Sequence, residues 1–187
     1  TREDDVFLIG RGAIKRPGIP SKYSRPLVEG DRLRDFATAE PVVAIWPYDS
    51  TTLAASADTT LLRFLWCWRA QLSTRFAFGQ SQVERGLEWF EYSMFFPSRY
   101  RTPLSIAFAF VATHNHFVLD RGGKVFKQSA PVIKLAAGAS VDDHLTLMGQ
   151  LNSSVACFWM QQVFHNKGAS VDTKGARQTT VAWDNFY

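Results

Sequence analysis

The chain has 187 residues, of which 46% are hydrophobic, 14% aromatic and 20% charged, a composition typical of folded rather than disordered proteins. This length fits one domain that can bury a core without disulfide or metal staples, and no apolar run approaches the roughly 20 residues of a membrane-spanning helix, so a membrane is not an expected partner. Lys and Arg number 21 against 17 Asp and Glu, so the formal net charge of +4 is a mild positive excess.

Short strands separated by turn residues are expected in the first third of the chain. The apolar run at residues 6–9 predicts a strand, whereas the Pro- and Gly-rich segment 16–20 supports neither a helix nor a sheet ladder. Asp31 is a candidate N-cap for a short helix over residues 31–36. The β-branched residues of segment 42–46 predict a strand that the following proline ends.

The middle of the chain combines a helix with further strands. Leucines recurring at spacings of three and four favour a helix between residues 51 and 75. The apolar run 105–111 predicts a buried strand. Residues 116–119 and 124–126 are expected to form a hairpin around a double-glycine turn, and residues 131–135 predict one more strand.

Two consecutive helices are expected towards the C-terminus. Ser140 or Asp142 is the candidate cap of the first helix, and Asn152 or Ser153 that of the second. The two helices would form a hairpin or a bent pair. Many short strands with one inserted helix, followed by a helical pair, predict a mixed α+β fold in a single domain, residues 1–187.

The cysteines and the N-terminus indicate the cellular compartment. Cys67 and Cys157 lie in aromatic-rich runs, so we expect them to be buried, reduced thiols of a cytoplasmic protein. The chain begins with Thr1 rather than Met, and acidic residues stand where a secretory signal would carry bases. We therefore expect a processed or excised piece of a larger protein.

Positive charge gathers between residues 11 and 34, where only Glu29 and Asp31 oppose it. A basic segment of this kind predicts a polyanionic partner, with nucleic acid the first candidate. By charge alone, a solvated basic loop is an equally good interpretation. The candidate phosphate-contacting residues are Arg11, Lys15, Arg16, Lys22, Arg25, Arg32 and Arg34.

A second, weaker contact set is expected around the polar segment Thr-His-Asn-His at residues 113–116, beside the basic hairpin. An Asn side chain that reaches a DNA groove can bind adenine through two hydrogen bonds. A polar bend at the end of a strand is an alternative of similar weight. The second set comprises Asn115, His116, Lys124 and Lys127.

The aromatic residues have apolar neighbours, which favours the core over a platform for stacking bases. Those between residues 89 and 100 are instead candidates for an exposed protein-docking surface. The aromatic residues assigned to the core are Trp66, Trp68, Phe108, Phe110, Phe158 and Trp159.

Motifs for catalysis or cofactor binding are weak. Gly10-Arg11-Gly12 follows a predicted strand, but segment 15–18 cannot form the helix N-terminus that a dinucleotide or S-adenosylmethionine site needs. His114 and His116 lack further zinc ligands at the usual spacings, and neither GxSxG nor SxxK occurs. We therefore assign no catalytic, cofactor-binding or metal-binding residue.

Several segments, in this order, resemble the C-terminal target-recognition region of adenine-specific DNA methyltransferases. RPLVEGDRLRDF at residues 25–36 resembles RPL-x-x-G-x-x-(I/V)-R-D-(W/F), and AIWPYD at residues 44–49 resembles I-Y-P-Y-D. AFAFV and HFVLD, within residues 107–120, are similar to the central strands of that region. LNSS at residues 151–154, followed by FW at 158–159, is similar to its helical hairpin.

The similarity covers about residues 5–165, and residues 100–135 resemble most the large methyltransferases of BREX (phage growth limitation) defence systems. This resemblance implies a TaqI-like specificity domain with an irregular, β-rich portion (β-helix-like), an inserted helix and a C-terminal α-hairpin. The β-rich recognition part would span about residues 1–135, the hairpin about 140–166 and a tail 167–187.

The resemblance also implies partners and a reaction. Such a domain grips double-stranded DNA opposite a catalytic domain of the same parent chain, which flips an adenine and methylates its N6 from S-adenosylmethionine. Other proteins of the defence system are further implied partners.

The chain departs from the family in the catalytic motifs. The (Asn/Asp/Ser)-Pro-Pro-(Tyr/Phe) motif that holds the flipped base is absent, since no Pro-Pro occurs, and so is the strand–GxG–helix cofactor site. We therefore expect this fragment to bind DNA and give sequence specificity, with no catalysis and no cofactor of its own. The alternatives are a protein–protein docking module of a defence complex and a stand-alone enzyme with a site that the motifs do not reveal.

Overall fold

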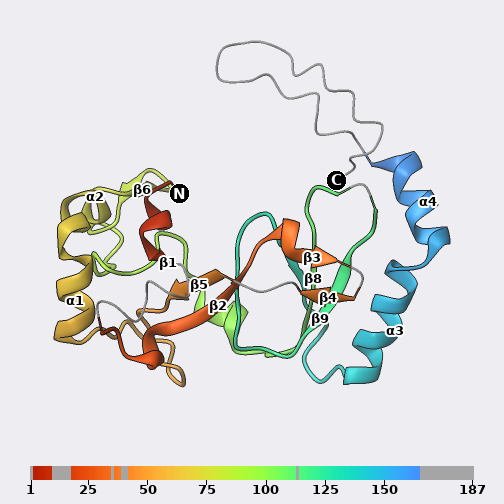
Figure 1. Ribbon diagram of the computed structural model, residues 1–187, viewed down its shortest axis with the longest axis horizontal. Coiled ribbons are helices and arrows are strands. Elements are labelled where there is room, and N and C mark those ends of the chain that lie inside the picture. Colours follow the sequence, from red (N-terminus) through yellow and green to blue (C-terminus); the bar gives the residue numbers. More distant parts are fainter. Residues whose placement is uncertain (1, 10–17, 35, 39–41, 113, 165–187) are drawn as a thin grey trace, which may run out of the picture. The chain divides into compact units, whose positions relative to one another are not determined.

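The computed structural model in Figure 1 describes residues 2–9, 18–34, 36–38, 42–112 and 114–164. The chain divides into two compact units, each assembled from two separate stretches of sequence. The first unit combines Thr1–Leu27 with Val42–Arg101, and the second combines Val28–Pro41 with Thr102–Tyr187. The architecture is mixed α and β with several small sheets, as expected.

In the first unit, strand β5 (Val42–Ile45) pairs antiparallel with β1 (Leu8–Ile9) on one side and with β2 (Ser24–Val28) on the other. The strand predicted at residues 42–46 is thus confirmed. The strand predicted at residues 6–9 is shorter, because the 3-10 helix η1 (Arg2–Phe7) occupies its first half.

The helix predicted between residues 51 and 75 is shorter than expected and is interrupted by a 3-10 turn. Helix α1 (Thr59–Leu65) begins after Asp58, whose carboxylate accepts hydrogen bonds from the amides of the first helical turn, and it continues through η4 (Trp66–Trp68) into α2 (Arg69–Ser73). Its leucines reach the core as their spacing predicts, since Leu61, Leu65 and Leu72 are fully buried. Residues 50–52 form a turn instead, in which the Asp49 carboxylate accepts hydrogen bonds from the backbone amides of Thr51 and Thr52.

Aromatic rings fill the rest of the first unit. Phe95 stacks on Tyr48 with ring centroids 3.8 Å apart, and Trp46 and Tyr92 pack edge-on around them. The aromatic rings of residues 89–100 therefore pack within the unit and do not form the exposed docking surface that the sequence suggested.

The second unit holds a three-stranded antiparallel sheet in which β8 (Ser105–Phe108) lies between β11 (Val132–Ile133) and β9 (Phe117–Asp120). The strands expected over residues 105–111 and 131–135 are confirmed but shorter, since β8 ends at Phe108 and β11 has two residues. The expected hairpin between β9 and β10 (Val125–Phe126) is wrong, because the two strands belong to different sheets.

The short helix expected over residues 31–36 is also wrong. One 3-10 turn, η3 (Gly30–Arg32), leads into the strand β3 (Leu33–Arg34), which pairs with β4 (Ala37–Thr38). In this extended backbone, Leu33 is completely buried.

The two C-terminal helices begin at candidate caps. Ser140 caps α3 (Val141–Leu151) in a capping box with Asp143, and Ser153 caps α4 (Ser154–Val163). In Figure 1, α4 continues beyond the end of α3 as a bent pair, so the expected hairpin is not confirmed.

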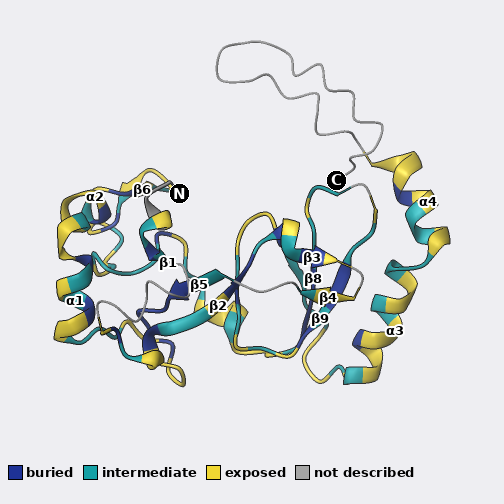
Figure 2. Cartoon of the chain, viewed as in Figure 1, coloured by how far each residue is buried: buried dark blue, intermediate teal, exposed yellow. Residues whose placement is uncertain are grey.

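Several residues assigned to the core are exposed. Trp66, Phe158 and Trp159 expose 61%, 65% and 58% of their surface, and Figure 2 shows how much of α4 is exposed. The free Cys67 is exposed as well, and Cys157 is half-buried. An apolar neighbourhood in the sequence does not bury these side chains, because they lie on the outer faces of their helices. Within the described residues, no helix has the length and apolar character needed to cross a membrane.

Replacing Gly30 with Ala tests the packing of the second unit. A Cβ at this position would lie 2.1 Å from the Ser129 carbonyl oxygen, so backbone must move. We expect the free energy of unfolding to fall by about 1–3 kcal/mol, measured by urea denaturation. Gly149→Ala is the control, because a Cβ there meets nothing within 4 Å and should add up to about 1 kcal/mol of helix stability. An unchanged urea midpoint for Gly30→Ala would contradict the close approach.

Candidate nucleic-acid interface

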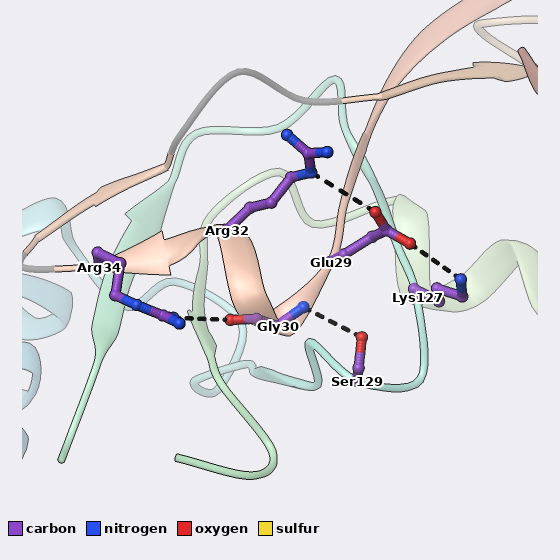
Figure 3. Close-up of polar contacts among 6 residues, drawn as sticks. All are labelled: Glu29, Gly30, Arg32, Arg34, Lys127 and Ser129. Carbon is purple, nitrogen blue, oxygen red and sulfur yellow. Dashed lines mark hydrogen bonds and ion pairs between the residues drawn. The ribbon is translucent and has the colours of Figure 1, made fainter. Parts of the chain in front are cut away.

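Three of the predicted DNA-contacting cations lie around the 3-10 turn η3 in the second unit (Figure 3). The Glu29 carboxylate accepts a hydrogen bond of 2.9 Å from Lys127 Nζ, and its other oxygen lies 3.5 Å from Arg32 Nε. The Gly30 amide donates to Ser129 Oγ at 3.0 Å, which joins the same two segments through a second contact. Residues almost 100 positions apart are thus brought together around one carboxylate. We call Glu29, Arg32 and Lys127 the Glu29 cluster.

Arg34 differs from the Glu29 cluster because its described partners are backbone carbonyls rather than a carboxylate. Its Nη1 donates to the carbonyl oxygens of Leu33 at 2.6 Å and Gly30 at 3.3 Å, while the residue as a whole is exposed. These bonds use one of its nitrogens, and no acidic side chain in the described part of the chain pairs with it. Arg34 is therefore the cation of this group best suited to a phosphate.

The electrostatics of the Glu29 cluster follow from its geometry. The hydrogen bond from Lys127, assisted by the charge of Arg32, holds the pKa of Glu29 below its ordinary 4.5, although partial burial opposes the shift. The carboxylate is therefore ionised at neutral pH and neutralises part of the positive charge on its two neighbours.

Lys22 and Arg25 belong to the first unit. Lys22 Nζ lies 3.5 Å from the Asp58 carboxylate and 4.7 Å from the centre of the Tyr23 ring. The guanidinium of Arg25 lies over Trp46 at 4.5 Å from the ring centre, and the residue is half-buried. Both cations thus have partners within their own unit.

Asn115 has a structural role that the sequence did not reveal. Its Nδ2 donates to the carbonyl oxygens of Leu151 at 2.5 Å and Ser153 at 3.1 Å, where α3 ends and α4 begins. Asn152 completes the joint by exchanging two hydrogen bonds with the backbone of Phe117. The amide nitrogen of Asn115 therefore holds a helix end, a use that competes with reading adenine.

His116 and Lys124 complete the second contact set. His116 is half-buried, and its ring centre lies 6.5 Å from that of the exposed His114. Lys124 forms an ion pair with the buried carboxylate of Asp120, across the two glycines that turn the chain. Lys124 thus stabilises the turn after β9 through its ion pair, as Lys127 stabilises the contact with Glu29.

A cavity of about 210 Å³ lies beside these residues in the second unit. Phe108 and Phe117 line it, their rings stacked with centroids 5.4 Å apart, and Met160 lines it from α4. The His114 and His116 side chains also contribute to its wall. Its mainly apolar lining offers little hydrogen bonding to a nucleobase and suits an apolar group better.

The predicted site residues therefore fall into separate groups. Arg32, Arg34 and Lys127 lie together in the second unit, and Lys22 and Arg25 lie in the first. Arg11, Lys15 and Arg16 lie outside the described residues. Among the described residues, no group of three or more His, Cys, Asp or Glu side chains is placed to hold a metal ion.

Two exposed cations, Arg63 and Arg69, were not among the predicted contact residues although their helical spacing gives a signal. Arg63 and Arg69 lie on the helical segment whose leucines face the core, and both are exposed. Their helical spacing from Leu61, Leu65 and Leu72 could have placed them on the outer face.

The chain was compared with known families and proteins. No family model matches it. Over nearly its whole length, however, the sequence is similar to part of an adenine-specific methyltransferase, which supports the resemblance drawn from its motifs. That relative is the adenine-specific methyltransferase PglX of Streptomyces coelicolor, and the two are 40% identical over 188 residues. The match covers 98% of this chain and 16% of PglX, so the chain spans about a sixth of that protein's length.

Replacing Glu29 with Gln tests the Glu29 cluster. Because the pKa of Glu29 is lowered in the folded state, its ionised form stabilises the fold above the unfolded pKa, and this contribution is lost as the pH falls through the folded pKa. At pH 7 we expect Glu29→Gln to lower the free energy of unfolding by about 1 kcal/mol. The difference from the unchanged chain should shrink below about pH 5.

Asp31→Asn is the matched control for this titration. It removes the same charge two positions away from an exposed carboxylate that has no ion pair within the described part of the chain. A stability difference for Glu29→Gln that stays constant from pH 7 to pH 3 would show that the carboxylate is not held by Arg32 and Lys127.

Proposed function

We propose that the chain is the DNA-binding target-recognition region of an N6-adenine DNA methyltransferase of a bacterial phage-defence system. The observation that carries this proposal is the 40% identity to an adenine-specific methyltransferase along 98% of the chain. A sequence-specific DNA methyltransferase needs a surface that holds the duplex in register as well as a catalytic pocket.

In this proposal, methyl transfer takes place elsewhere in the parent protein. The chain has no Pro-Pro motif to hold a flipped adenine, and its GxG segment is not followed by a helix-forming sequence. S-adenosylmethionine would be bound by a catalytic domain of the same parent chain. The working partners are then double-stranded DNA, that catalytic domain and other proteins of the defence system, in the cytoplasm.

The expected contact residues contribute unequally. Arg34 is exposed and bonded only to described backbone carbonyls, so it can neutralise a phosphate without giving up an acidic partner. Arg32, Lys127, Lys124 and Lys22 must instead exchange a carboxylate for a phosphate, which returns little net free energy. These four cations would set the field around the duplex more than they add affinity.

A protein-docking function is the second candidate, and the exposed face of α4 favours it. Val155, Phe158 and Trp159 expose 78%, 65% and 58% of their surface on a helix that carries no charged residue. Apolar side chains exposed together are typical of interaction sites. This face is a better candidate for docking than the aromatic residues of segment 89–100, because the latter pack within the first unit.

Salt titration of duplex binding separates the two functions. A DNA-binding region should lose affinity steeply with salt, with a log–log slope of about −0.9 for each phosphate contact. Reversing the charge of both Arg32 and Arg34 to Glu should make that slope shallower and weaken binding, measured by fluorescence anisotropy with a labelled duplex.

Two further observations serve as controls for that titration. Circular dichroism of the double variant should match that of the unchanged chain, so that lost binding is not lost folding. No heat of binding is expected when S-adenosylmethionine is added to the chain in a calorimeter. A salt-independent affinity, or no duplex binding at low salt, would contradict the DNA-binding proposal, and specific S-adenosylmethionine binding would contradict the absence of a cofactor site.

A further inference from the structure

The outer face of the α1–η4–α2 segment carries two cations on either side of an indole. Arg63, Trp66 and Arg69 are all exposed, with 61% of Trp66 accessible, whereas Leu61 and Leu65 on the inner face are fully buried. The three residues are spaced by three positions, and the 3-10 turn η4 lies between the two helices. Since side chains three positions apart line up in a 3-10 helix, Trp66 and Arg69 are expected to share one line along the surface.

Side-chain contacts confirm this alignment for Trp66 and Arg69. The guanidinium carbon of Arg69 lies 4.8 Å from the centre of the Trp66 ring, within the range of a cation–π interaction. The Trp66 ring also meets Trp89 edge-on, with ring centroids 6.2 Å apart. The indole is therefore held from one side and still exposes most of its surface, while Arg69 is pre-oriented upon it.

The arginines on this face differ from several cations of the basic segment 11–34 in having no described carboxylate partner. Within the described part of the chain, neither Arg63 nor Arg69 has a carboxylate partner. By contrast, Lys22 lies beside Asp58, and the Glu29 cluster neutralises itself in part. A phosphate that meets Arg63 and Arg69 thus forms new charge-assisted hydrogen bonds without breaking an ion pair.

We propose that Arg63, Trp66 and Arg69 form a DNA-backbone contact site, which we call the Arg–Trp–Arg face. The two guanidinium groups bind phosphate oxygens of duplex DNA, and the Trp66 indole packs on the sugar between them. Arg suits this role because its planar fork of donors matches a phosphate, and its stacking on Trp66 reduces the ordering cost on binding. The inference rests on the proposed function and adds to it a site in the first unit.

Neutral variants test the site without changing the sign of any charge. The first variant is Arg63→Gln with Arg69→Gln. The matched control is Arg99→Gln with Arg101→Gln, which removes the same charge from two exposed arginines of the same unit. Duplex affinity is measured for each between about 50 and 200 mM salt, a range in which phosphate contacts change affinity strongly.

The two variants have different expected results. Losing two phosphate contacts should make the log–log salt slope shallower by about 1.8, whereas the control should keep a slope close to that of the unchanged chain. Equal changes in both variants would show that only net charge matters and would overturn the site. If the unchanged chain does not bind the duplex at low salt, the proposed function itself fails.

A chemical footprint provides a readout that needs no substitution. The thiol of Cys67 is exposed and directly follows Trp66, while Cys157 lies in the second unit and is half-buried. Saturating duplex DNA should slow alkylation of Cys67 by iodoacetamide more than that of Cys157, quantified by mass spectrometry. Alkylation of Cys67 at the same rate with and without bound duplex would overturn the site while leaving DNA binding by the chain intact.

Discussion

Irregular backbone must find hydrogen-bond partners when it is buried, and this requirement shapes both units. The strands are only two to five residues long, so sheet ladders bind only a small share of the backbone N–H and C=O groups. Backbone groups of turns and loops supply further partners, and side chains add to them. The buried guanidinium of Arg75 donates to the carbonyl oxygens of Leu72, Trp89 and Glu91, and the Asn115 amide donates at the end of α3. Polar residues that look functional in the sequence are therefore partly committed to holding loops.

Several cations are likewise bound by partners within the fold. Glu29 draws Arg32 and Lys127 together, and Asp120 binds Lys124, so a basic stretch of sequence does not become an equally basic surface. The cations left for a polyanion are those with no acidic partner in the described part of the chain, such as Arg34, and they need not be neighbours in sequence. In the duplex contact that we propose, this selection decides which arginines add affinity.

Local sequence patterns predicted the features that depend on a single helix. The spacing of Leu61, Leu65 and Leu72 identified the buried face of the broken helix, and the caps at Ser140 and Ser153 located α3 and α4. Pairing between distant segments was not predictable: the two glycines after β9 have the positive φ of a tight turn, yet β9 and β10 belong to different sheets. The candidate site shows the same limit, since no local signal links Glu29 to Lys127 or Asn115 to a helix end 36 residues away.

Exchange of this segment between two adenine methyltransferases of different sequence specificity is the most direct test of the target-recognition role that we propose for it. The methylated adenines of host DNA would be located by sequencing for each parent protein and for each chimaera. If the segment reads the target, the methylated sequence follows it into the chimaera. Methylation that keeps the sequence specificity of the remaining protein would contradict a recognition role.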